Sequence, residues 1–107
     1  MGAEARFDDL VAEMLQHPGV TPPGAGRGFG SSALRVHGAI FAMLVRGRLV
    51  LKLPASRVDA LITAGEGERF DANKGTPMRE WLSLDPASGL SWTDLAEEAL
   101  AFVRGRR

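Results

Sequence analysis

The sequence contains no cysteine and no tyrosine, and only two of its 107 residues are histidine. The absence of cysteine excludes a disulfide scaffold, a cysteine zinc site and a thiol nucleophile. The 13 basic and 13 acidic residues cancel to a net charge of zero. This balance argues against a protein that binds nucleic acid through phosphate contacts alone. Hydrophobic residues make up 45% of the chain, which indicates a globular core rather than disorder.

Long apolar segments are also missing. The longest uninterrupted apolar run is residues 39–45, whereas a membrane-spanning helix needs about 20 residues. The N-terminal residues are acidic and lack the basic and apolar regions of a targeting segment. We therefore expect a cytoplasmic protein without membrane contact. The length fits one domain over residues 1–107.

Patterns that carry catalysis or metal binding are scarce. His17 and His37 have no partner at metal-ligand spacing. The glycine-rich residues 24–30 follow a predicted helix and precede a predicted strand, which is the reverse of a phosphate-binding loop. Ser31 and Ser32 follow Gly30 but form no nucleophile elbow. We therefore expect no catalytic residue, no cofactor and no metal site, and a protein that is not an enzyme.

Hydrophobic spacing predicts the order α-β(3)-α-β(2)-α, an α+β fold with an antiparallel sheet in two layers. Phe7, Leu10 and Met14 lie on one face of a first helix that ends before Pro18. A Gly/Pro-rich loop is expected over residues 18–30, and Ser91 is expected to cap the last helix. The remaining predicted elements are strands at 31–36, 39–45 and 48–53, a helix at 55–64 with Gly65 as its cap, and strands at 69–71 and 79–84 joined by 73–77.

The X-Gly pairs at 37–38 and 46–47 predict two-residue hairpin turns. This register pairs Val45 with Arg48, Met43 with Val50, and Phe41 with Lys52. Strict alternation then places two sets of side chains on opposite faces. One face would carry Leu34, Val36, Ala39, Phe41, Met43 and Val50, and the other Arg35, Ile40, Ala42, Leu44, Leu49, Leu51 and Leu53. Trp81 is expected to lie opposite Leu82 and Leu84.

Charge is segregated along the chain. Residues 14–58 contain six bases and no acid, whereas residues 59–103 contain nine acids and three bases. One interpretation is that acidic helices lie over a basic sheet edge within the molecule. The other is a basic face for an acidic protein or a nucleic acid. Because only one face of a two-layer sheet is covered by helices, we expect an apolar patch with a basic rim on the other. The predicted partner-binding residues are Phe41, Met43, Val50, Arg48, Lys52 and Arg35.

Several short motifs together resemble the TfoX/Sxy N-terminal-domain family. They are GFG at Gly28–Gly30, the meander LRVHGAIFAMLVRGRLVLKL, the segment KGTPMREWLSLDP, and LAFVRG in the last helix. A related likeness is to the YjbR/MmcQ group of small α+β proteins. The TfoX-type resemblance implies the same α-β(3)-α-β(2)-α order and carries no known catalytic residues. Met78 and Trp81, within the third motif, are expected to pack the sheet against a helix.

Three functional hypotheses follow. The first is a non-enzymatic interaction module that binds a protein partner or a second copy of itself, with a role in transcriptional regulation as the family resemblance implies. The second is a nucleic-acid-associated regulator that uses Arg35, Arg46, Arg48 and Lys52. The third is a small-molecule binder or enzyme with its site near Arg27, His37 and Arg79.

Overall fold

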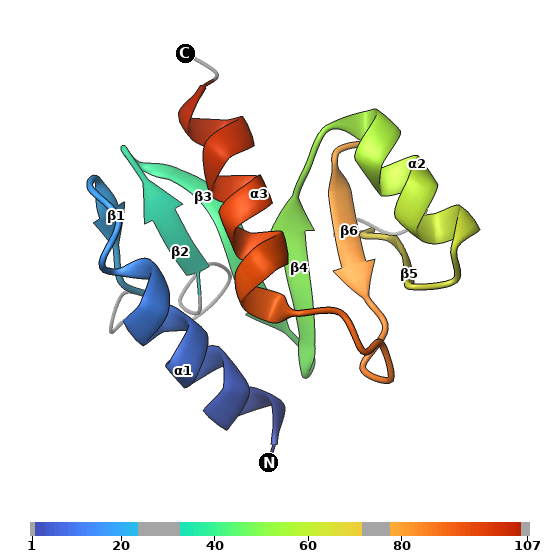
Figure 1. The fold of residues 1–107 in the computed structure, drawn as a ribbon, viewed down its shortest axis with the longest axis horizontal. Helices are drawn as coiled ribbons and strands as arrows, with labels where there is room; N and C mark the ends of the chain where they lie inside the picture. The colour runs from blue at the N-terminus through green and yellow to red at the C-terminus, as the bar shows by residue number, and fades with distance from the viewer. Residues whose placement is uncertain (1, 24–32, 72–77, 106–107) are drawn as a thin grey trace.

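The computed structural model describes residues 2–23, 33–71 and 78–105, and in this part of the chain three helices cover one side of an antiparallel sheet (Figure 1). The helices are α1 (Ala3–Met14), α2 (Ala55–Thr63) and α3 (Trp92–Arg104). The strands are β1 (Val20–Thr21), β2 (Ala33–Val36), β3 (Ala39–Val45), β4 (Arg48–Lys52), β5 (Gly67–Arg69) and β6 (Trp81–Leu84). The predicted α+β class with an antiparallel sheet is confirmed. The glycine-rich residues 24–30, the serines at 31–32 and the connection at 73–77 lie outside the described residues.

The sheet has the order β1-β2-β3-β4-β6-β5, and each described pair of neighbours is antiparallel. The predicted meander is β2, β3 and β4, and β6 then pairs with β4 and places β5 at the edge. β1 was not expected, because Val20 and Thr21 fall in the predicted loop. Val20 pairs with Val36, and the His37 amide donates to the Gly19 carbonyl at 3.2 Å. This short strand satisfies backbone groups on the outer edge of β2, which would otherwise be open to other strands.

Both predicted hairpin turns are confirmed. His37 and Gly38 have φ of 50° and 84°, and Arg46 and Gly47 have φ of 51° and 78°. Two consecutive residues with positive φ are typical of the type I′ turn, whose twist matches that of the flanking strands. The β3–β4 register pairs Val45 with Arg48 and Met43 with Val50, as predicted.

The predicted division of side chains between the faces is wrong in the first half of β3, because β3 contains a β-bulge at Phe41. Leu34 on β2 pairs with Ala42, but its neighbour Arg35 pairs with Ile40, so Phe41 has no partner on β2. The extra residue reverses the alternation. Phe41 is therefore buried with Ala42 under the helices, at 0% exposure, and Ile40 moves to the helix-free side.

The same bulge corrects the assignment of β2. Leu34 and Val36 belong to the core under the helices, and not to the face of Met43 and Val50. Arg35, which pairs with Ile40, lies on the helix-free side.

The ends of two helices form as predicted. The Ser91 hydroxyl accepts a hydrogen bond from the Asp94 amide at 3.1 Å and caps α3. After α2, Gly65 has φ of 80°, and the Glu66 amide donates to the Leu61 carbonyl at 3.0 Å. This pattern is a Schellman cap.

The last two strands differ from the prediction in their bounds. β5 begins at Gly67 rather than Arg69, because the chain leaves the α2 cap already aligned with Leu84 of β6. β6 begins at Trp81 rather than Arg79, because the Trp81 amide donates to the Met78 carbonyl at 3.1 Å in a turn.

The main core lies between the sheet and the helices. All three helices contribute to it, with α3 crossing β2, β3 and β4, α1 packing beside α3, and α2 lying beside β5 and β6 (Figure 1). The buried residues of α3 are Trp92, Leu95, Ala96, Ala99, Leu100 and Val103, and Phe102 is half-buried. Trp81 lies opposite Leu82 and Leu84, as predicted.

A second, smaller apolar cluster lies on the helix-free face. Its buried members are Ala33, Met43, Val50 and Phe70, with Ile40, Val45, Met78 and Trp81 packed around them. The cluster contains no helix residue. The expectation that Met78 and Trp81 pack the sheet against a helix is therefore wrong, because both side chains cover the opposite face.

Candidate functional site

The helix-free face of the sheet is the candidate functional site, but its apolar centre is not open. Met43 is 3% exposed and Val50 is 0% exposed, because the smaller cluster surrounds them. Phe41 does not reach this face. These three predicted partner-binding residues are therefore not surface groups, whereas Arg35, Arg48 and Lys52 are partly exposed on this side of the sheet.

The partly exposed side chains form a row that crosses four strands. Arg35 on β2 pairs with Ile40 on β3, and Lys52 on β4 pairs with Trp81 on β6. Ile40 and Lys52 line the same hollow, so the two pairs are neighbours. We call Arg35, Ile40, Lys52 and Trp81 the cross-strand row. At about 4.8 Å between strands, the row spans roughly 14 Å.

Lys52 and Trp81 are the most closely linked members of the row. The Lys52 ammonium lies 5.3 Å from the centroid of the Trp81 ring, within the range of a cation–π contact. The same ammonium lies 4.0 Å from a Glu80 carboxylate oxygen, with about a third of each side chain exposed. The attraction between the two groups is weak, because they are 4.0 Å apart and both are partly exposed to water. Lys52 is therefore available to another anion.

Two hollows flank Trp81. One has a volume of about 370 Å³ and is lined by Ala39, Ile40, Lys52, Trp81 and Val103. The other has a volume of about 550 Å³ and is lined by Ala55, Met78, Arg79, Glu80 and Trp81. The Trp81 indole ring therefore lies between two recesses, which are lined by apolar side chains and bordered by charged ones. This arrangement can accept an apolar side chain of a partner that has an acidic residue next to it.

The residues of the small-molecule hypothesis are not brought together as one site by any described hollow. Arg79 is exposed and lines the hollow beside Met78. His37 is at the β2–β3 turn, where its ring packs against Gly19. Arg27 lies outside the described residues.

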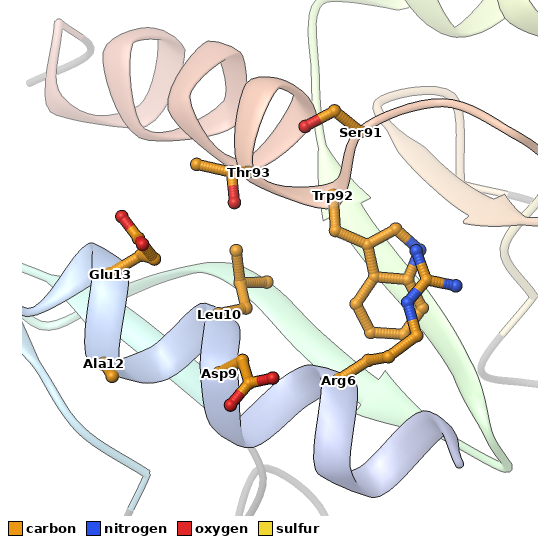
Figure 2. A pocket seen from close by; sticks show the side chains of 8 residues that line it. All are labelled: Arg6, Asp9, Leu10, Ala12, Glu13, Ser91, Trp92 and Thr93. Carbon is orange, nitrogen blue, oxygen red and sulfur yellow. The ribbon is translucent and has the colours of Figure 1, made fainter. Parts of the chain in front are cut away.

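A further hollow, of about 600 Å³, lies between α1 and the start of α3 (Figure 2). The Arg6 guanidinium covers the Trp92 ring at 4.1 Å from its centroid, while Asp9 and Glu13 line the α1 side. Sequence reasoning missed this hollow. The available signal was the spacing of Arg6, Asp9 and Glu13, which places a polar stripe beside the apolar stripe of α1.

Within the described ranges, no group of three or more histidine or acidic side chains is arranged to hold a metal ion. Among the same residues, no helix is both long enough and apolar enough to cross a membrane. No family model, curated protein or solved structure matches this chain. The likeness to the TfoX N-terminal domain therefore stays a prediction from the motifs.

Proposed function

We propose that this chain is a non-enzymatic interaction module that binds an acidic segment of a partner protein across the cross-strand row. The observation that supports it is the alternation of cationic and apolar side chains over four neighbouring strands. Arg35 and Lys52 supply the charge, and Ile40 and Trp81 supply the apolar contacts. Interfaces commonly combine apolar anchors, aromatic ones above all, with a charged rim in this way.

Charge favours a different protein over a second copy as the occupant. Two copies that meet face to face through this row would gather four cations, Arg35 and Lys52 of each copy, in one interface, and like charges in one interface are costly. An acidic segment instead meets two cations, one of which, Lys52, has a long ion pair with Glu80. Zero net charge and the partial burial of Trp81 disfavour a strand of nucleic acid.

The test is a selection from a library of random peptides displayed on phage, followed by affinity measurement of the enriched peptides. We expect enrichment of sequences that combine aspartate or glutamate with an aromatic or aliphatic residue. Lys52→Gln should weaken binding about tenfold, which corresponds to roughly 1.4 kcal/mol. The control is Arg57→Gln, which removes a cation of the helix layer that pairs with Glu98, and which should leave affinity unchanged.

Four outcomes would contradict the proposal. The first is a selection without acidic enrichment, and the second is equal affinity for wild type and Lys52→Gln. The third is tight binding of a random oligonucleotide with a steep dependence on salt, which would identify the nucleic-acid alternative instead. The fourth is dimerisation through the row, measured by sedimentation and abolished by Trp81→Ala, which would identify a second copy as the occupant.

A further inference from the structure

Arg48 holds the least satisfied polar group among the described residues. Its Nη2 donates to the Ser83 carbonyl oxygen at 3.2 Å. Its Nε is buried and has no hydrogen-bond acceptor, and no other side-chain nitrogen or oxygen in the described ranges shares this condition. A buried donor without an acceptor costs about 1–3 kcal/mol, and more when it is charged. Such a group calls for an acceptor that comes from outside the described chain.

A pocket of about 270 Å³ lies beside this guanidinium, between the β3–β4 turn and the β5–β6 edge of the sheet. Its polar lining consists of Arg46, Arg48, Glu68, Arg69, Asp71 and Ser83. Arg69 also pairs with Asp59 of α2. Neither Arg46 nor Arg48 forms an ion pair with a carboxylate of the described residues. The two cations therefore have no carboxylate of the described residues at ion-pair distance, although Glu68 and Asp71 line the same pocket.

We propose that this pocket binds one carboxylate group, held by Arg48 and Arg46. A guanidinium presents parallel N–H donors that match the two oxygens of a carboxylate, and Arg48 lines the pocket with one donor, Nε, that has no acceptor among the described residues. The carboxylates of Glu68 and Asp71 line the same pocket and repel anions. Three arginines and two carboxylates line the pocket, so its net charge is about +1, which one singly charged carboxylate balances and a doubly charged phosphate exceeds.

The carboxylate has two possible sources, a small free acid or the side chain of an aspartate or glutamate on a partner. Arg48 lies on the same strand and the same face as Lys52, so an acidic segment on the cross-strand row can also reach the pocket. The second source rests on the proposed function. The pocket itself does not, because the argument for it depends only on Arg48 and its surroundings.

The test is an NMR titration of the ¹⁵N-labelled protein with sodium acetate at constant ionic strength. The probe is the Arg48 Nε–H resonance, which is assigned by its loss in Arg48→Lys. We expect a saturable shift in wild type. Arg46→Asn should weaken acetate binding at least fivefold. The turn should stay intact in this variant, because asparagine tolerates positive φ. The matched control is Arg57→Gln, which removes a cation of the helix layer outside the pocket and should leave acetate binding unchanged.

Each outcome decides the proposal. A shift that does not saturate, or that is the same in Arg46→Asn, means an adventitious ion only and overturns it. A stronger response to phosphate than to acetate overturns the carboxylate preference. Saturation by acetate without competition from the peptides selected on the cross-strand row supports the pocket with a free acid. Competition between acetate and those peptides supports a partner side chain as the source. If the peptide selection on the cross-strand row fails, the acetate titration still tests the pocket independently.

Discussion

Phe41 and Met43 are two positions apart on β3, yet they are buried on opposite faces of the sheet. In an ideal strand they would share a face. The bulge at Phe41 separates them, so one ring fills the core under the helices and one thioether fills the small cluster on the other side. This arrangement also brings Ile40, rather than Phe41, into the cross-strand row.

Because of the bulge, we expect substitutions of the neighbouring residues Phe41 and Ile40 to change the free energy of unfolding by very different amounts. Phe41→Ala removes a ring that is 0% exposed, and we expect it to lower the free energy of unfolding by about 3–5 kcal/mol. Ile40→Ala removes a half-buried side chain, and we expect a loss of less than half as much. Urea denaturation followed by circular dichroism measures both. Equal losses for the two variants would show that Phe41 is not in the main core.

The bulge also marks the limit of what the sequence predicts. The X-Gly pairs, the Ser91 cap and the Gly65 cap are local signals, because the residues that form each feature are adjacent in the chain. The structure follows them. The bulge has no local signal in a run as uniformly apolar as residues 39–45. It is set by how β3 pairs with β2, and by which side chain fills the space under α3.

The sequence also predicted only part of the candidate site. Arg35, Arg48 and Lys52 lie on the helix-free side, but β2 and β3 had to be placed in register before their neighbours were known. Trp81 was assigned to the face opposite Leu82 by simple alternation. Its pairing with Lys52 could not be foreseen, because β6 inserts between β4 and β5 only after the chain has passed through α2.

The β3–β4 turn predicts a stabilising substitution. Arg46 has φ of 51°, a conformation that costs most side chains about 1 kcal/mol and that asparagine adopts more readily. Arg46→Asn should therefore raise the free energy of unfolding by about 0.5–1 kcal/mol. Arg46→Val should lower it, because a β-branched side chain is strained there. Thermal unfolding of the two variants checks the prediction, and the reverse ranking would exclude the type I′ turn.

The close packing around Gly67 predicts that a larger residue at this position destabilises the pairing of β5 with β6. A Cβ at this position would overlap the Ser83 carbonyl oxygen and come within 3.2 Å of the Leu84 Cα, both of which are backbone atoms. Gly67→Ala must therefore push β5 away from β6, and we expect a loss of about 1–3 kcal/mol. The control is Gly89→Ala, where a Cβ would have no neighbour within 4 Å. Hydrogen exchange at the Phe70 and Asp85 amides, which bond across this pair, should speed up only in Gly67→Ala. Unchanged exchange there would contradict the close approach.

The Arg6–Trp92 contact predicts a spectroscopic change that can be separated from unfolding. Trp92 is 8% exposed and the Arg6 guanidinium covers its ring, so Arg6→Ala should uncover the indole at a cost of about 0.5–1 kcal/mol. The measurement uses the Trp81→Phe background, in which Trp92 is the remaining tryptophan. We expect red-shifted emission and stronger quenching by acrylamide. Asp9→Ala, which changes another residue of the same hollow, should leave the emission unchanged. If Arg6→Ala and Asp9→Ala gave the same spectrum, the stacking of Arg6 on Trp92 would not be what shields the ring.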